Sequence, residues 1–386
     1  MRSNRTLFIC ACLGMLTFGI VLTVLGAVLP AVVEKFGIDK AQAGSLFLLM
    51  TFGILAASLV FGPMVDRYGY KGMLLLATFL IAAGLEAMAF ARGMMALRAA
   101  ILMIGFGGGI VNGGTNALVA DISSEAKGAN LQLLGVFFGI GAVGVPFLLA
   151  TLGGSFANQS LIAVVGGLVL IPFVIIAVTW FPAPKQPQGF PIAAVGRLIR
   201  DPVLLLVGTM LFLESGMEIT VGGWTSTFVN EELAVPARTA LIVLSLYWAG
   251  MMLARLALGT VLRGVPPIRA LFTCLAVGFA GAVVLLITHS VSVAALGVFM
   301  LGIGFAATFP TVLGIVGERY AELSGTAFSM VITMALIGGM FFPWITGVAG
   351  NQYGMRGSFM IVPIAILLLA TLLTAFSARI RATSTA

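Results

Sequence analysis

The chain has 386 residues, of which 60% are hydrophobic and only 9% are charged, and its mean hydropathy is +1.16. A soluble domain carries about a quarter charged residues, so this composition excludes an ordinary water-soluble protein and predicts one that lies in lipid. The net charge of +7 does not indicate a nucleic-acid partner, because the basic residues are scattered singly between apolar runs.

Hydrophobic runs in chain order predict twelve transmembrane helices, so the expected fold class is an all-α membrane protein. A spanning helix needs roughly 20 apolar residues. The first run is too long for a signal peptide and lacks a cleavage site, so we expect a retained helix. Breaks in hydrophobicity place the spans at 7–33, 43–65, 72–91, 96–121, 128–154, 158–181, 201–230, 237–263, 268–288, 291–317, 322–350 and 356–378.

The lysines and arginines predict the orientation. Most of them lie on the side of the two termini, and short cytoplasmic loops are enriched in these residues. We therefore expect a multi-pass protein of the cell inner (plasma) membrane with both termini in the cytoplasm. The proline-rich stretch 182–200 is expected to be a cytoplasmic linker between an N-terminal six-helix bundle, 1–181, and a C-terminal six-helix bundle, 201–386.

The two halves are similar in sequence. At one constant spacing, residues of the first half match residues of the second: Gly19 with Gly216, Thr23 with Thr220, Asp121 with Glu318, and Pro146 with Pro343. Two similar bundles that face each other can rock about a site at the membrane midplane. This pseudo-two-fold repeat favours a carrier over a channel or an enzyme.

The segment from Gly62 to Gly72, between the second and third spans, reads GPMVDRYGYKG. It resembles the loop signature of the major facilitator superfamily, in which glycines, Asp-Arg and a further base recur. The resemblance implies the major facilitator fold and a cytoplasmic gate. Tyr70 stands where the family usually has a base. The gate residues that the resemblance implies are Gly62, Asp66, Arg67 and Lys71.

Three further gate residues follow from the sequence itself. The repeat pairs Asp121 with Glu318 at the cytoplasmic ends of two helices. Arg255 lies inside the eighth span, where a base needs an acid or carbonyl oxygens as partners. We expect it to form a salt bridge on the cytoplasmic side.

Short motifs in the seventh, fourth and tenth spans are similar to those of the fucose–galactose–glucose/proton symporters and the sodium-dependent glucose transporters. The seventh span has Gly-Met-Glu from Gly216 and Gly-Gly-Trp ending at Trp224, and the tenth has Phe-Pro-Thr ending at Thr311. The fourth span reads Asn-Gly-Gly-Thr-Asn from Asn112 to Asn116. Asn112 replaces the acid of that group, and the first span has no acid, so the usual proton sites are missing.

The seventh span supplies the candidate cation-coupling residues, Glu214 and Glu218. They are four residues apart and share one helix face. An acid within the membrane is costly and by default indicates function. Two close carboxylates could carry a proton or coordinate sodium; the alternative is a structural hydrogen bond between helices.

The candidate substrate-binding residues carry groups that suit sugar hydroxyls. Amides both donate and accept hydrogen bonds, although they also join helices. Tryptophan can stack on a pyranose ring, but it is also a common interface anchor. The set is Asn112, Asn116, Glu218, Trp224, Thr308 and Thr311.

The resulting hypothesis is a secondary active transporter that imports a hexose or related sugar by alternating access. The rival is a proton-driven exporter of amphipathic drugs or lipids, which the 19 methionines would suit. We expect no catalysis, no metal, no cofactor beyond a coupling Na⁺ or H⁺, and a monomer in the bilayer. The solute, the coupling ion and the direction of transport stay open.

Overall fold

The computed structural model describes residues 2–123, 127–182, 198, 200–262, 264–320 and 324–384. Within these ranges the side chains at 2–3, 63, 66, 127–129, 132, 324–326 and 379–384 lie outside the description. Most of the predicted linker, 182–200, and the side chain of the predicted gate residue Asp66 therefore fall outside it.

The described chain is built of α-helices and contains no strand in the ranges given above. The first half holds α1 (Arg2–Phe36), α2 (Lys40–Ala89), α3 (Met94–Ile122), α4 (Lys127–Leu152) and α5 (Asn158–Val178). The second half holds α7 (Pro202–Glu232), α8 (Ala237–Gly259), α9 (Pro267–Ile287), α10 (Val291–Phe305), α11 (Thr308–Arg319), α12 (Ser324–Ser358) and α13 (Ile361–Ser384).

Twelve stretches of these helices are long and apolar enough to cross a membrane, which confirms the predicted fold class. Helix α2 contains two of them, Lys40–Gly62 and Arg67–Ala89, and α10 with α11 makes up the tenth, Val291–Arg319. The eleventh was predicted at 322–350 but extends over Ala327–Ser358. The residues after Gly354 in this stretch belong to a second helical segment that follows a kink.

The breaks expected at these two places are present, because α2 and α12 each consist of two helical segments that meet at a kink. In α2 the only non-helical residue is Gly69, with φ 73°, and in α12 it is Gly354, with φ 72°. This backbone conformation is open to glycine at no steric cost. One glycine thus turns the chain between two membrane spans.

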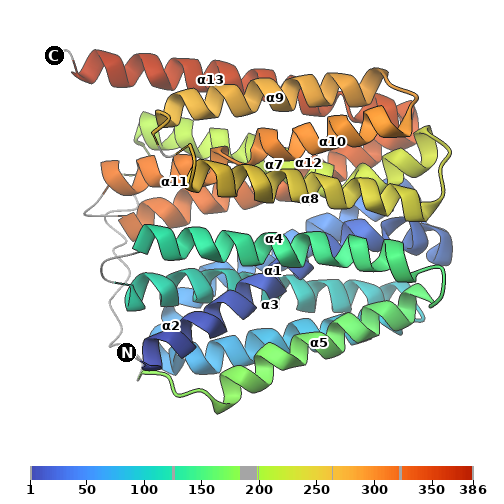
Figure 1. The fold of residues 1–386 in the computed structure, drawn as a ribbon, viewed down its shortest axis with the longest axis horizontal. Helices are drawn as coiled ribbons and strands as arrows, with labels where there is room; N and C mark the ends of the chain where they lie inside the picture. Colours follow the sequence, from blue (N-terminus) through green and yellow to red (C-terminus); the bar gives the residue numbers. More distant parts are fainter. Residues whose placement is uncertain are drawn as a thin grey trace.

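Figure 1 shows the helices of the first half, blue to green, lying together below those of the second half, yellow to red. Both chain ends lie at the same end of the bundle, which we call the terminal end; the opposite one is the distal end. The halves meet where α1 packs against α7, α2 against α12, and α4 against α8. Which end faces the cytoplasm stays a prediction.

Candidate functional site

The two acids of α7 lie inside the molecule. Glu214 is 0% exposed and Glu218 is 9% exposed. Helix α7 runs without a break from Pro202 to Glu232. Asp201 caps its first turn, its carboxylate accepting hydrogen bonds from the backbone N–H groups of Val203 and Leu204. An uninterrupted helix keeps the two carboxyls one turn apart on one face.

Arg255 of α8 is the base nearest to these acids. Its Nη2 lies 3.8 Å from Oε2 of Glu218, and its Nε donates a hydrogen bond to the carbonyl of Ala306 over 3.3 Å. That carbonyl would normally accept from the residue four positions on, but Pro310 has no N–H to donate. The proline of the Phe-Pro-Thr motif therefore leaves an acceptor for the arginine.

The position of Arg255 differs from the expected one. It has the acid and carbonyl partners that the sequence predicts, but its acid is Glu218 inside the membrane rather than a group at the cytoplasmic helix ends. The structure thus brings Arg255 together with the predicted cation-coupling pair. Its role as a gate residue stays a prediction.

Aromatic side chains surround this charged group. Phe138 of α4 lies under the Arg255 guanidinium, 5.8 Å from ring centroid to Cζ, and edge-on to Trp248, 5.9 Å between centroids. Tyr247 donates its hydroxyl to the backbone carbonyl of Glu218 over 3.2 Å. Phe138 comes from the first half, so the cluster spans the contact between the halves.

Several buried polar atoms have no hydrogen-bond partner among the described residues. They include Oε1 of Glu214 and Nε1 of Trp248 in this group, and Oγ1 of Thr308 at the start of α11. A buried polar atom without a partner costs roughly 1–3 kcal/mol, and such atoms are rare in folded proteins. They mark a place where a bound solute or ion could supply the missing partners.

The charges of this group do not balance. Glu218 and Arg255 act electrostatically on Glu214, whose Oε2 accepts a hydrogen bond from Ser215 over 3.3 Å. Arginine stays charged in proteins, so two ionised carboxylates leave a net charge of −1. An uncompensated charge in a low-dielectric interior is costly. One monovalent cation would make the group neutral.

The predicted amides of the first half bond to each other. Nδ2 of Asn116 donates to the backbone carbonyl of Asn112 over 2.9 Å and to its Oδ1 over 3.2 Å, and both side chains are half-buried. They lie on α3, which packs against α1, and α1 in turn packs against α7. The substrate-binding role of the two amides stays a prediction.

The remaining predicted binding residues differ in their surroundings. Trp224 is fully buried, its Nε1 donates to the carbonyl of Pro343 over 2.9 Å, and its ring lies 6.0 Å from that of Phe47 in the other half. Its polar atom and both ring faces are therefore in use within the protein. Thr308 is buried and Thr311 is half-buried.

Two of the predicted gate residues, Lys71 and Asp121, contact other groups at the terminal end. The hydroxyl of Tyr70 donates to Oδ2 of Asp121 over 2.7 Å, so the tyrosine that replaces the family's base still contacts an acid. Lys71 donates to the carbonyl of Thr179, the residue that ends α5, over 3.0 Å. The residues Gly62, Arg67 and Glu318 are exposed.

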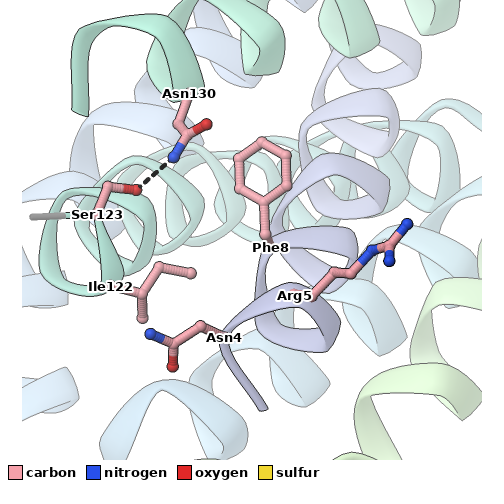
Figure 2. Close-up of a pocket in the computed structure, with 6 residues that line it drawn as sticks. All are labelled: Asn4, Arg5, Phe8, Ile122, Ser123 and Asn130. Carbon is pink, nitrogen blue, oxygen red and sulfur yellow. Dashed lines mark hydrogen bonds between the residues drawn. The ribbon is translucent and has the colours of Figure 1, made fainter. Parts of the chain in front are cut away.

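A separate pocket of about 230 Å³ lies at the terminal end of the first half. Figure 2 shows its lining residues, with Nδ2 of Asn130 donating to the hydroxyl of Ser123 over 2.8 Å. None of the predicted substrate-binding residues lines it. The described residues contain no cluster of three or more potential metal ligands. The charged group at Glu218 is therefore the candidate site.

Comparisons with known proteins agree with the fold. The sequence matches the family model described as Major Facilitator Superfamily over residues 7–334. It is 23% identical over 394 residues to the glucose/mannose transporter GlcP of Bacillus subtilis, covering 96% of this chain and 93% of that protein. It is also 26% identical over 160 residues to the 4-hydroxybenzoate transporter PcaK of Pseudomonas putida, covering 41% of this chain but only 35% of that one.

Among solved structures, a bacterial homolog to the human lysosomal transporter Spinster superposes with a TM-score of 0.80. The two share 13% sequence identity, and the match covers 97% of each chain. This likeness is one of fold.

Proposed function

The chain belongs to the major facilitator superfamily of secondary transporters for small solutes, and we propose that it carries a hexose or related sugar by alternating access, coupled to one monovalent cation per sugar. The observation that carries the proposal is the set of two buried acids of α7 and the half-buried base of α8 that lies beside them.

The cation follows from the charge of this set. With Glu214, Glu218 and Arg255 all ionised, the set has a net charge of −1, and one bound proton or sodium ion neutralises it. Closing the site off from water on both sides, as the halves rock around it, is less costly when its buried charges balance. Cation binding would thus precede the rocking of the halves, and release would follow it.

The sugar follows from the uncharged polar atoms. Nε1 of Trp248 is a donor, and the hydroxyl of Thr308 can donate and accept. A sugar hydroxyl also does both, so it could pair with these atoms and with the carboxylate of Glu218. The likeness to a glucose/mannose transporter over nearly the whole chain supports the same solute class.

The second candidate solute is an aromatic acid, such as the 4-hydroxybenzoate in the name of PcaK. Phe138 and Trp248 would suit its ring, and Arg255 its carboxylate. Arg255 already lies beside Glu218, however, and a bound carboxylate would change the net charge of the site from −1 to −2. We therefore favour the neutral sugar.

Uptake by purified protein in liposomes tests the proposal. Labelled glucose, mannose, galactose and fucose are compared under an imposed proton gradient, an imposed sodium gradient and neither. We expect saturable hexose uptake that one of the two gradients accelerates. Competition by 4-hydroxybenzoate and by amphipathic drug cations is measured in the same vesicles. Uptake of these compounds without any hexose transport would overturn the sugar assignment.

Matched variants separate coupling from binding. Glu214→Gln leaves Glu218 and Arg255 as a neutral pair, so we expect hexose exchange to persist while the gradient no longer drives accumulation. Glu86→Gln is the control. Glu86 is also an acid within a membrane span, but it is half-buried and lies in the second span of α2, Arg67–Ala89, rather than in α7. A Glu214→Gln protein that still accumulates sugar against its gradient would contradict the cation assignment.

A further inference from the structure

Two segments at opposite ends of the bundle share one pattern. The terminal segment, Tyr68 to Gly72, reads Tyr-Gly-Tyr-Lys-Gly, and the distal segment, Tyr353 to Gly357, reads Tyr-Gly-Met-Arg-Gly. The first glycine in each bends the chain between two spans, with φ 73° and ψ 167° in the former and φ 72° and ψ 172° in the latter.

The base of each pattern makes the same kind of contact. Lys71 donates to the carbonyl of Thr179, where α5 ends, and Arg356 donates over 3.0 Å to the carbonyl of Thr288, where α9 ends. Each contact stays within one half and satisfies a carbonyl that the helix end leaves without a partner. The two segments thus share a sequence pattern, a bend and a kind of contact, although they lie at opposite ends of the bundle.

The distal segment is also fixed to α7. The backbone N–H of Arg356 donates to Oε1 of Glu232 over 3.0 Å, and its Nε lies 3.4 Å from Oε2 of the same carboxylate. Asn351, which precedes the segment in α12, is held in place relative to the end of α7. The second half therefore presents Asn351 and the neighbouring Glu231 from one rigid distal surface.

Both of these residues bind Lys40, the first residue of α2 in the other half. Nζ of Lys40 lies 2.9 Å from Oε2 of Glu231, and the backbone N–H of Lys40 donates to Oδ1 of Asn351 over 3.0 Å. The amide is one of those that the start of a helix leaves without an intrahelical partner. Gly347 of α12 packs against the Lys40 carbonyl so closely that a side chain there would not fit.

We propose that Lys40, Glu231 and Asn351 form a latch, the distal latch, which holds the two halves together at the distal end and must open to expose the transport site to that side. The proposal rests on the alternating access of the proposed function but not on the identity of the solute. Under the predicted orientation the distal end is extracellular.

The strength of the latch suits a contact that breaks in every cycle. The side chains of Lys40 and Glu231 are 24% and 40% exposed, so water and salt screen their attraction. An exposed pair of this kind shifts an equilibrium by roughly two- to fivefold. The hydrogen bond from the Lys40 amide adds a contribution that does not depend on salt.

Distances between spin labels at Glu34→Cys and Gln352→Cys test the latch without any solute. Both positions are exposed at the distal end, one in each half, and the three native cysteines are buried. We expect Lys40→Ala to raise the population with a long label distance roughly two- to fivefold. Added salt should raise it in the parent protein but not in Lys40→Ala.

Two further variants make the test specific. Exchanging the charges, in the double variant Lys40→Glu with Glu231→Lys, should restore the parent distance distribution. Asn351→Ala should raise the long-distance population by an amount that salt does not change. The control is Lys35→Ala, which removes a distal lysine that contacts its own neighbour Phe36. Equal distributions in the parent and Lys40→Ala, with hexose uptake intact, would overturn the latch and leave the proposed function standing.

Discussion

The two halves of the molecule carry different chemistry at corresponding positions of the repeat. Where α7 has Glu214 and Glu218, the matching positions of α1 have Thr17 and Val21, both fully buried. Thr17 donates its hydroxyl to a carbonyl of its own helix, that of Leu13, over 3.0 Å. At these two positions the duplicated helix thus carries acids in one half and none in the other.

The same division holds on the neighbouring helices. Arg255 corresponds to Ser58, whose hydroxyl also bonds within its own helix, to the carbonyl of Ile54 over 2.8 Å. In the opposite sense, Asn116 of the first half corresponds to Leu313 of the second. The second half therefore holds the charged group, and the first half supplies uncharged amides. This difference suggests that cation binding belongs to one half and that the solute contacts both.

The largest expected effect comes from removing the only base of the charged group. Arg255→Gln leaves two acids without compensation, and breaking a buried ion pair by removing one partner costs roughly 3–5 kcal/mol. Both side chains retain some exposure, 24% and 12%, so we expect the lower end, about 3 kcal/mol. Thermal unfolding in detergent should show a lower midpoint, and hexose uptake should be lost.

The control is Ser58→Ala at the corresponding position, which should change both measurements little. The double variant Arg255→Gln with Glu218→Gln removes the unpaired acid as well, so part of the stability should return. An Arg255→Gln protein with the parent unfolding midpoint and gradient-driven uptake would show that the charges do not act as one group.

Much of the fold could be predicted from the sequence because a bilayer sets a simple length rule. Twelve apolar runs became twelve spans. The differences are ones of detail: the connections around Gly69 and Gly354 are kinks at a single glycine between two helical segments, rather than longer loops. A single positive-φ glycine is a weak signal among the 49 glycines of this chain.

The site was only partly predictable, because its contacts join residues far apart in the chain. Glu214 and Glu218 were found as acids inside a span, and the need of Arg255 for a partner was clear. That its partner is Glu218 depends on how α7 packs against α8. Tyr247 gave no signal, since one aromatic among apolar residues is not distinctive; its contact became visible only in three dimensions.

A smaller effect is expected from the amides of the first half. Asn116→Leu introduces the residue that the repeat has in the second half, and removes hydrogen bonds worth about 1 kcal/mol each. If the amides bind the sugar, KM for hexose should rise roughly five- to tenfold, while the dependence on the cation gradient stays as in the parent. Asn130→Ala, which removes an amide bonded to Ser123 outside the site, is the control. An unchanged KM would leave Asn116 as a contact between helices.

The smallest effect is expected at the start of α7. A hydrogen bond between a tyrosine and an aspartate holds it in place, and Tyr70 and Asp121 form a similar bond in the first half. The hydroxyl of Tyr320 donates to Oδ2 of Asp201 over 2.8 Å. Burial disfavours the ionised carboxylate, but this bond, the backbone N–H groups of Val203 and Leu204, and the charge of Arg319 together lower the pKa of Asp201 below its ordinary value of 3.8. The pKa of Tyr320 is raised to about 12, by burial first and then by Asp201, so its hydroxyl stays a donor at neutral pH.

The sign of the pH dependence follows from the lowered pKa. Asp201 stabilises the folded state above pH 3.8, and this contribution is lost as the pH falls through the lower folded value. Loss of the cap in Asp201→Ala should cost about 1 kcal/mol at pH 7, and the difference from the parent should shrink below pH 3.8. Asp201→Asn keeps an acceptor for the backbone N–H groups but cannot ionise. It should therefore lose less stability than Asp201→Ala at pH 7, and its difference from the parent should also shrink below pH 3.8. A deficit in Asp201→Ala that persists unchanged at low pH would mean that the carboxylate charge contributes nothing to holding α7.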